Sequence, residues 1–426
     1  MAGRILQEDI EALKQRADIA EVVSDHTQLK RSGARLKGLC PFHQEKTPSF
    51  TVDPASGYYH CFGCSEGGDV YSFLEKVEGL TFVEAVEQLA RRTGYQLRYE
   101  ELSAGQKRAL GERSRLVAAN EAAAEFFHRT LFSEQGEAAR AYLKERGFGR
   151  EEAEHFRVGF APLEWEALSR RLTGQRFAER ELVQAGLALK SNRGGIRDRF
   201  RGRLLFPVLD LNGDVIGFGG RVVPGLDYGG REEAKYLNTA ETPVYKKSRV
   251  LYGMSWARPE VVRTGEVLVC EGYTDVMALH QAGFTNAVAT CGTAVGEEHV
   301  ALLQRYADRA VLAFDSDSAG EKAAERAWEL AQAADLEVRV LVMPAGEDPA
   351  DLVREDGADI VRELVAAAEP VVRFMLRRAA DGHAATPEGR AAAVDAVAPI
   401  LAKIDDAVLR DQYTRWAADE LVGVGL

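Results

Sequence analysis

The pattern of hydrophobic positions predicts a helical N-terminus and a parallel sheet in the second half of the chain. Apolar residues recur at three- and four-residue steps over 7–23, which favours a helix. Valine-rich apolar runs occur at 267–270, 286–290, 310–314 and 338–343. Helical patterns separate these runs, at 274–282, 297–306 and 319–334. Continuously apolar strands that alternate with helices indicate a parallel sheet with both faces covered.

Weaker patterns fill the region between these two parts. Helical periodicity is present at 70–77 and 82–93, lapses around 98–106, and resumes at 116–131 and 138–145. Residues 196–223 alternate as strands do, and we expect glycine-containing turns at 212–213 and 217–220. After Pro349 the sequence becomes rich in alanine and acidic residues and is helical to the end.

Composition restricts the class of protein. The 426 residues, 46% of them hydrophobic and with a net charge of −12, fit a folded chain of two to four domains. No apolar run approaches the roughly 20 residues of a membrane span. The N-terminus lacks a signal segment, so we expect a cytoplasmic protein without membrane contact. Five cysteines in this length exclude a disulfide framework and favour a metal site instead.

Two short motifs predict a zinc centre. Cys40-Pro-Phe-His43 and Cys61-Phe-Gly-Cys64 each place two ligands at a spacing that reaches one tetrahedral ion. The intervening residues fit a hairpin that returns the second motif to the first. Three thiolates and one imidazole leave no open position, so one structural zinc ion is expected. His60 is a competing ligand, but its position breaks the two-residue spacing.

Aromatic and basic residues surround this centre and leave two interpretations open. The aromatic residues either stack on the bases of a single strand or fill a small core. They are Phe42, Phe50, Tyr58, Tyr59 and Phe62, with Lys30, Arg31, Arg35, Lys37 and Lys46 nearby.

Carboxylates follow two of the predicted parallel strands. Glu271 comes directly after 267–270, and Asp315 and Asp317 come directly after 310–314. Ligands bind at the carboxyl ends of such strands, where three carboxylates would repel one another without a cation. Oxygen ligands favour Mg²⁺ or Mn²⁺, and a divalent pair is the usual device of phosphoryl transfer.

A basic stretch precedes the sheet. Six lysines and arginines lie between Lys190 and Arg203, and Arg221, Lys235 and Lys247 continue the trend. Basic residues beside a divalent-metal site suggest that a polyanion binds across both, although scattered surface charges are usually only solvated.

Together these motifs resemble the bacterial DnaG-type primases along nearly the whole chain, in an order and spacing that are distinctive. The residues that carry the resemblance are Cys40-Pro-Phe-His43, Cys61-Phe-Gly-Cys64, Arg199–Pro207, Gly217-Phe-Gly-Gly-Arg221, Lys235-Tyr-Leu-Asn238, Val269-Cys-Glu-Gly-Tyr-Thr-Asp275, Phe314-Asp-Ser-Asp317 and Gly346-Glu-Asp-Pro349.

The resemblance implies an α+β multidomain fold. Its expected parts are a zinc-binding ribbon domain at 1–100, a linker at 101–115, a basic mixed α/β subdomain at 116–262, a Toprim parallel α/β sheet at 263–345 and a C-terminal helical segment at 346–426.

The resemblance also implies a DNA-directed RNA polymerase that makes short primers de novo from ribonucleoside triphosphates on single-stranded DNA, as a monomer. Glu271, Asp315 and Asp317 would hold the catalytic Mg²⁺ or Mn²⁺, and Asp275 and Asp348 match further acidic positions. Template, primer or nucleotide would be held by Arg199, Arg203, Arg221, Lys235 and Lys247.

The chain departs from the family pattern in two places. The usual Asp-Pro-Asp reads Asp348-Pro349-Ala350-Asp351, so Asp348 either caps a helix that starts at Pro349 or completes the metal site. Asp351 either falls in the first turn as a carboxylate that is favoured there without any metal, or partly replaces the carboxylate missing at Ala350. The family also binds the replicative helicase through a C-terminal domain, which we expect to be missing from this chain.

Two other interpretations use the same sheet. A type IA topoisomerase needs a nucleophilic tyrosine in a large gate domain, and only Tyr413 follows the sheet. A recombination mediator would combine zinc, Toprim and single-stranded-DNA binding without catalysis, but it does not account for the basic stretch.

Overall fold

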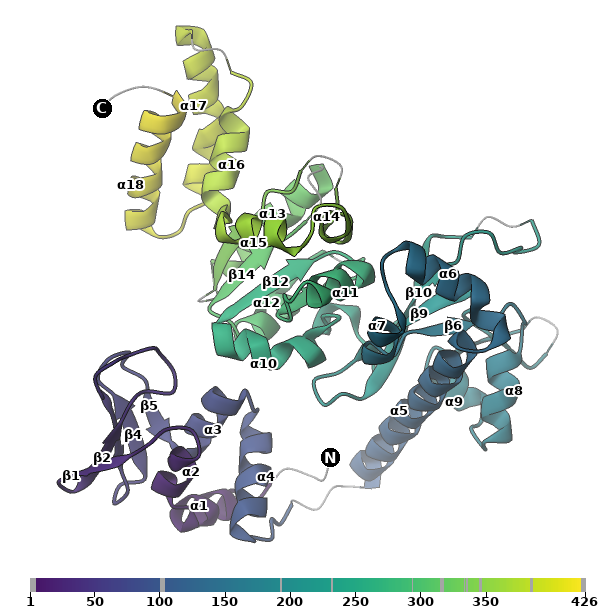
Figure 1. Cartoon of the computed structure of the whole chain (residues 1–426), viewed down its shortest axis with the longest axis horizontal. Helices are drawn as coiled ribbons and strands as arrows, with labels where there is room; N and C mark the ends of the chain where they lie inside the picture. The colour runs from purple at the N-terminus through teal and green to yellow at the C-terminus, as the bar shows by residue number, and fades with distance from the viewer. Residues whose placement is uncertain are drawn as a thin grey trace. The chain divides into compact units, whose positions relative to one another are not determined.

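The protein divides into two compact units, Met1–Glu112 and Arg113–Leu426, shown in a computed structural model (Figure 1). The structure describes residues 5–99, 104–191, 194–230, 233–292, 294–314, 318–332, 334, 336–344, 347–383 and 386–422.

The first unit is a five-stranded antiparallel sheet with helices packed on its apolar face. Its strands, in the spatial order β1 to β5, are β1 (Lys30–Ser32), β2 (Arg35–Gly38), β3 (Phe50–Asp53), β4 (Tyr58–Cys61) and β5 (Gly67–Asp69). Its helices are α1 (Gln7–Arg16), α2 (Ile19–Ser24), α3 (Val70–Glu78) and α4 (Phe82–Thr93). The helix expected over 7–23 is therefore two helices, because Ala17 leaves the helical conformation and Asp18 caps α2.

Local signals fix the ends of these helices. Asp69 caps α3 by accepting hydrogen bonds from two backbone N–H groups, and Thr81 and Glu84 form a capping box at α4. Asp9, fully buried in α1, accepts hydrogen bonds from the backbone and side chain of Arg98. These bonds hold the pKa of Asp9 below its usual range and anchor the end of the unit to its first helix.

Most of a long helix, α5 (Ala104–Leu131), belongs to the second unit, and the stretch expected to be a linker is helical from Ala104 onward. This segment contains good helix formers without an apolar stripe, which explains the lapse in periodicity. The boundary between the two units, at Glu112, falls inside it.

An antiparallel sheet of order β11-β10-β9-β6 packs against α5. Its strands are β6 (Gly159–Ala161), β9 (Arg203–Leu209), β10 (Val215–Val222) and β11 (Tyr236–Asn238). Around it lie α6 (Glu137–Glu145), α7 (Arg150–His155), α8 (Ala167–Gly174), α9 (Glu179–Gln184) and the two-stranded sheet β7 (Ala188–Lys190) and β8 (Ile196–Asp198).

The turn expected at 217–220 is wrong, because these residues lie inside β10. Their glycines serve close packing instead. A Cβ added to Gly219 would lie 2.0 Å from the ring of Tyr273, so only glycine lets that aromatic ring approach the strand.

A second sheet, of order β13-β12-β14-β15-β16, has four parallel strands and one antiparallel edge strand. The parallel strands, close to the expected runs, are β12 (Glu266–Cys270), β13 (Ala287–Ala289), β14 (Arg309–Leu312) and β15 (Glu337–Val340), and the edge strand is β16 (Glu369–Pro370).

Both faces of this sheet are buried, as expected. Along β12, Leu268 and Cys270 join one core cluster, whereas Val267 and Val269 join another. The helices of the sheet are α10 (Met254–Thr264), α11 (Tyr273–Gln281), α12 (Glu297–Leu303), α13 (Ser318–Ala331), α14 (Pro349–Glu355) and α15 (Ala358–Ala366).

The C-terminal helices fall into two groups. α14 packs on α11 and α15, beside the parallel sheet. The last helices form a bundle (Figure 1): α16 (Val371–Ala380), α17 (Pro387–Ala402), α18 (Ala407–Trp416) and the π-helical turn η3 (Ala417–Val422). Through α16 this bundle packs on α13, β15 and β16 of the parallel sheet. Among the described residues, no helix is both long and apolar enough to cross a membrane.

Candidate metal centres and basic surface

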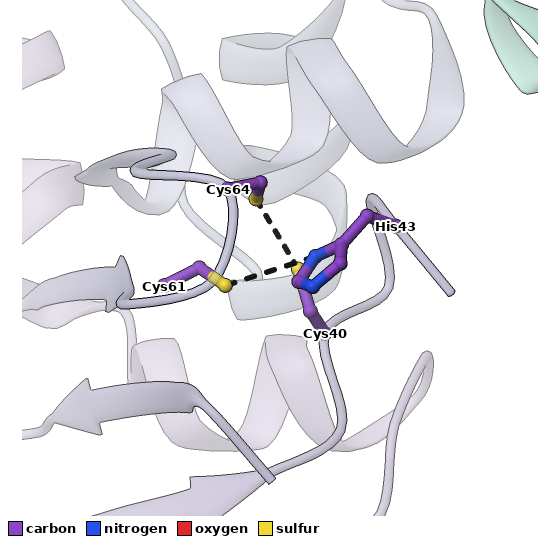
Figure 2. A group of neighbouring side chains, drawn as sticks. All are labelled: Cys40, His43, Cys61 and Cys64. Carbon is purple, nitrogen blue, oxygen red and sulfur yellow. Dashed lines mark hydrogen bonds between the residues drawn. The ribbon is translucent and has the colours of Figure 1, made fainter. Parts of the chain in front are cut away.

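The four predicted zinc ligands converge at one point (Figure 2). The ligand atoms of Cys40, His43, Cys61 and Cys64 all lie within 4.8 Å of one another. The Sγ atoms of Cys40 and Cys64 are 3.8 Å apart, as are Cys61 Sγ and His43 Nδ1. Two sulfur ligands about 2.3 Å from a tetrahedral zinc ion are separated by about 3.8 Å. The residues therefore fit zinc, with β3 and β4 forming the expected hairpin between the motifs.

Two polar neighbours of the centre were not predicted from the sequence. Glu45 Oε2 lies 3.4 Å from His43 Nε2, and Glu45 Oε1 accepts a hydrogen bond from the Cys40 N–H. Ser49 Oγ lies 3.1 Å from Cys61 Sγ. Burial raises the pKa of Cys61, but the Ser49 hydroxyl and the following backbone N–H groups bring it down to about 7. The available sequence signal was an acidic residue two positions after His43, since a carboxylate is one of the groups to which zinc-binding histidines donate their other ring N–H.

The aromatic residues of the ribbon divide between the two interpretations. Phe50 and Tyr59 are buried and pack with Phe42 and Phe73. Tyr58 and Phe62 are 50% and 70% exposed. The first group fills the core, and the second remains available to a ligand.

The carboxylate site lies where β12 ends. Glu271 is exposed directly after β12, and Asp275 is buried in the first turn of α11, where its Oδ2 accepts a hydrogen bond from Gly272 N–H. Asp315 and Asp317 lie outside the described residues, so their predicted place beside Glu271 stays a prediction.

Asp348 caps α14. It precedes Pro349, and its Oδ1 accepts a hydrogen bond from Asp351 N–H at 2.7 Å. Asp351 contacts Arg354 at 2.7 Å and Arg146 at 3.6 Å. Capping is thus present at Asp348, and a contribution to metal binding stays a prediction.

The predicted basic residues occupy different environments. Arg203 is only 2% exposed, and its guanidinium donates to Gly220 O, Ala234 O and Glu233. This position does not support a direct phosphate contact by Arg203, because its N–H groups already donate to groups of the protein.

Arg199 and Lys235 are better placed for a ligand, whereas Arg221 is buried, with 8% of the residue exposed. Arg199 donates to Asn238 O at 2.8 Å, while its Nε is buried without a partner. Arg221 donates to the Tyr236 hydroxyl, with its guanidinium carbon 5.1 Å from the centre of that ring. Lys235 is exposed beside β11.

Lys247 is held by α12. Its carbonyl lies 2.9 Å from Nε2 of the buried His299, and its N–H donates to Glu241. These contacts fix the backbone that presents the lysine side chain.

Trp165 is a candidate that the sequence did not single out. It is 44% exposed, and the guanidinium carbon of Arg201 lies 3.4 Å from its ring centre, with that of Arg197 at 5.6 Å. Both arginines belong to the predicted basic stretch, but nothing in the sequence placed a tryptophan between them.

Four family models match successive parts of the chain. One described as CHC2 zinc finger matches residues 5–105, and one described as DNA primase catalytic core, N-terminal domain, matches 126–258. A Toprim-like model matches 268–353, and a model described as DnaB-helicase binding domain of primase matches 372–421.

The last match corrects one expectation. The helicase-binding domain was expected to be missing from this chain, but the matched region takes in all of α17 and α18 and all of α16 except its first residue. The error arose because the segment beyond the sheet is short and its helices carry no ligand or catalytic motif, so their pattern indicates only generic helices.

Similar proteins from other organisms agree with the family models. A protein named DNA primase from Streptomyces coelicolor is 47% identical over 412 residues, covering 95% of this chain and 64% of that protein. The DNA primase of Mycobacterium leprae is 46% identical over 426 residues, covering 97% and 66% respectively. This chain thus spans slightly less than two thirds of the length of these relatives.

A solved structure extends the likeness to three dimensions. The RNA polymerase domain of Mycobacterium tuberculosis primase DnaG, crystallised with a double-stranded DNA oligomer bearing a 6-nucleotide overhang, superimposes with a TM-score of 0.66 at 40% identity. The match covers 73% of this chain and 98% of that domain. The zinc centre, the antiparallel sheet β11-β10-β9-β6 (the basic sheet, which carries Arg203 and Arg221) and the Toprim-like sheet follow one another in the order of the matching models. The chain belongs to the family of DnaG-type DNA primases.

Proposed function

We propose that this protein is a DNA-directed RNA polymerase that makes short primers de novo on single-stranded DNA. The observation that carries the proposal is the direct contact between the basic sheet and the carboxylate edge, which is the end of the parallel sheet where Glu271 follows β12. Asn238, in β11, hydrogen-bonds to Tyr273, which lies two residues after Glu271, and to Cys291 O. A phosphate chain held by Arg199, Arg221 and Lys235 would therefore lie beside Glu271.

The carboxylates are the proposed catalytic groups. Glu271, Asp315 and Asp317 would hold Mg²⁺ or Mn²⁺, which when bound stabilises charge on the phosphoryl oxygens during nucleotidyl transfer. Asp275 holds the turn that follows Glu271 by accepting from Gly272 N–H. Asp348 would assist the metal site from the start of α14.

The nucleic acid is proposed to follow basic and aromatic groups of the second unit, of which Lys235 and Trp165 are exposed and Lys247 is half-buried. Lys235 and Lys247 offer positive charge, and Trp165 offers a ring on which a base could stack. The buried Nε of Arg199 supports the same assignment, because an unpaired donor is costly unless a ligand satisfies it.

The open face of the ribbon would engage the template. Sheet register aligns Lys30, Lys37, Thr51 and His60 across one face. Tyr58, His60 and Phe62 are exposed at alternate positions along and beyond β4. Side chains at alternate positions of a strand point to the same face, and neighbours on that face are about 6.7 Å apart. A charged row beside spaced aromatic groups suits a single strand.

The partners of the whole protein belong to the same proposal. Residues 372–421 would contact the replicative helicase, in keeping with the description of the model that they match. A monomeric state and a cytoplasmic site of action stay predictions from the sequence.

One assay tests the function directly. The purified chain, loaded with zinc, is incubated with single-stranded DNA, four ribonucleoside triphosphates and Mg²⁺ or Mn²⁺. We expect short RNA whose sequence is complementary to the DNA. Tight DNA binding with no RNA under either metal would instead support a non-catalytic recombination mediator.

A further inference from the structure

A hydrogen-bonded cluster joins the basic sheet to the loop that carries Glu271. We infer that Asn238 and Tyr273 are positioning residues, which fix the Glu271 backbone for metal binding and couple it to Arg199. The inference rests on the proposed function, because it assigns the carboxylate edge to metal and Arg199 to an anion.

Asn238 occupies the centre of the cluster. It closes β11 opposite Gly219 of β10, so its backbone is fixed by the antiparallel sheet. Its Nδ2 donates to Cys291 O at 2.8 Å, and its Oδ1 accepts from the Tyr273 hydroxyl at 3.0 Å. One side chain therefore holds two segments of the neighbouring sheet.

Tyr273 anchors the residues that follow Glu271. As the first residue of α11, it is almost fully buried and stacks on Phe206 of β9, with ring centres 4.9 Å apart and planes 6° from parallel. Gly219 leaves room for the ring. Stacking fixes the plane of the ring, and the hydroxyl then points to Asn238.

Cys291 holds Glu271 from the other side. Its N–H donates to Glu271 O at 3.0 Å, while its own carbonyl accepts from Asn238. Its φ of 51° lies in the left-handed region, which residues other than glycine seldom adopt. The contact with Asn238 supports this unusual backbone, so loss of Asn238 or its hydroxyl partner would release Glu271.

Arg199 connects the cluster to the ligand side. Its Nη2 donates to Asn238 O at 2.8 Å, and burial lowers the pKa of its guanidinium. The part of the chain that the structure describes offers it no carboxylate within ion-pair distance. An anion bound at Arg199 would satisfy the free Nε, and because Arg199 also holds Asn238, anion and metal binding would favour each other reciprocally.

Metal binding without nucleic acid tests the inference. Mn²⁺ alone is titrated into the zinc-loaded full chain by calorimetry, for wild type, Tyr273→Phe and Arg199→Ala. We expect each variant to raise the half-saturating Mn²⁺ concentration about fivefold, the equivalent of one ordinary hydrogen bond. The variant that combines Tyr273→Phe and Arg199→Ala should need no more Mn²⁺ for half-saturation than the single variant with the lower affinity, because both changes release the same loop.

A matched control separates positioning from general loosening. Tyr228→Phe removes a hydroxyl that bonds Gly202 O and Val223 O in the same subdomain, with no link to Glu271. It should leave Mn²⁺ binding unchanged while altering the melting temperature as much as Tyr273→Phe does. Mn²⁺ binding within twofold of wild type in Tyr273→Phe, or an equal shift in Tyr228→Phe, overturns the inference. If the wild type makes no RNA while the variants still show the expected shifts in Mn²⁺ binding, the proposed function is refuted and the positioning role stands.

Discussion

At the scale of single residues, hydrogen-bond partners distinguish an arginine that supports the fold from one that keeps a donor for a phosphate. Arg203 is enclosed by two carbonyl groups and Glu233, whereas Arg199 keeps an unused donor. The two arginines stand at similar places in the basic stretch of the sequence. Their different environments depend on β10 and on the 233–234 segment, which no local pattern reveals.

Lys235 provides the simplest test of the basic surface. Lys235→Ala should weaken binding of single-stranded DNA and reduce the slope of log affinity against log salt by about 0.7, the value for one lost phosphate contact. The slope is measured by fluorescence anisotropy over a range of salt concentrations. If it matches wild type, Lys235 is ordinary solvated surface.

Asp348 poses a question that stability alone does not answer. Asp348→Asn still caps α14, so the melting temperature should stay unchanged. If Asp348 also assists the metal, the variant needs more Mg²⁺ for half-maximal RNA synthesis, while Asp351→Asn shows little metal effect. A metal titration of Asp348→Asn that overlays wild type would leave capping as its whole role.

At the scale of elements, close packing determines some strands that the hydrophobic pattern of the sequence does not reveal. The parallel strands were predictable because each lies in or beside a short run rich in valine and other apolar residues. The Gly217–Gly220 segment was misread as a turn because its glycines serve close packing inside a strand, and Gly219 makes room for Tyr273, a residue far along the chain. The edge strand β16 is only Glu369–Pro370, too short to leave any alternation.

The packing role of Gly219 predicts a large cost for one added methyl group. Gly219→Ala would force the new Cβ onto the Tyr273 ring in a strand paired on both sides. We expect the free energy of unfolding to fall by about 1–3 kcal/mol, as overpacked cores do. Chemical denaturation measures this change.

Gly174→Ala is the control for that experiment. Gly174 ends α8, and an added Cβ there meets nothing within 4 Å. Its stability should equal or exceed wild type. Equal stability of Gly219→Ala and Gly174→Ala would contradict the tight contact with Tyr273.

At the scale of the whole molecule, the two units have separate cores and separate sources of stability. The first unit packs a small cluster around Phe50 and Phe73, beside the zinc centre. The second has two larger clusters on the two faces of the parallel sheet. The zinc ligands were predictable because their spacing is local, whereas an acidic residue two positions after His43 is a weak signal, and its contact with His43 identified Glu45.

Removal of zinc should therefore affect one unit only. A structural zinc site contributes folding free energy directly, so chelation or Cys40→Ser should make residues 1–100 sensitive to protease. The second unit should remain resistant. Limited proteolysis followed by mass spectrometry locates the cuts, and readdition of zinc should restore protection in wild type but not in Cys40→Ser. Unchanged proteolysis of the metal-free protein would refute a structural role for zinc.

The central claim is that RNA synthesis depends on the carboxylates at the end of the parallel strands, while DNA is held elsewhere. Glu271→Gln is compared with Glu266→Gln, which changes the first residue of the same strand at the opposite edge. Primer synthesis and single-stranded-DNA affinity are measured for both variants at one salt concentration. The account predicts that Glu271→Gln makes no RNA yet binds DNA almost as wild type, and that Glu266→Gln retains both activities. Primer synthesis by Glu271→Gln near the wild-type rate would contradict it.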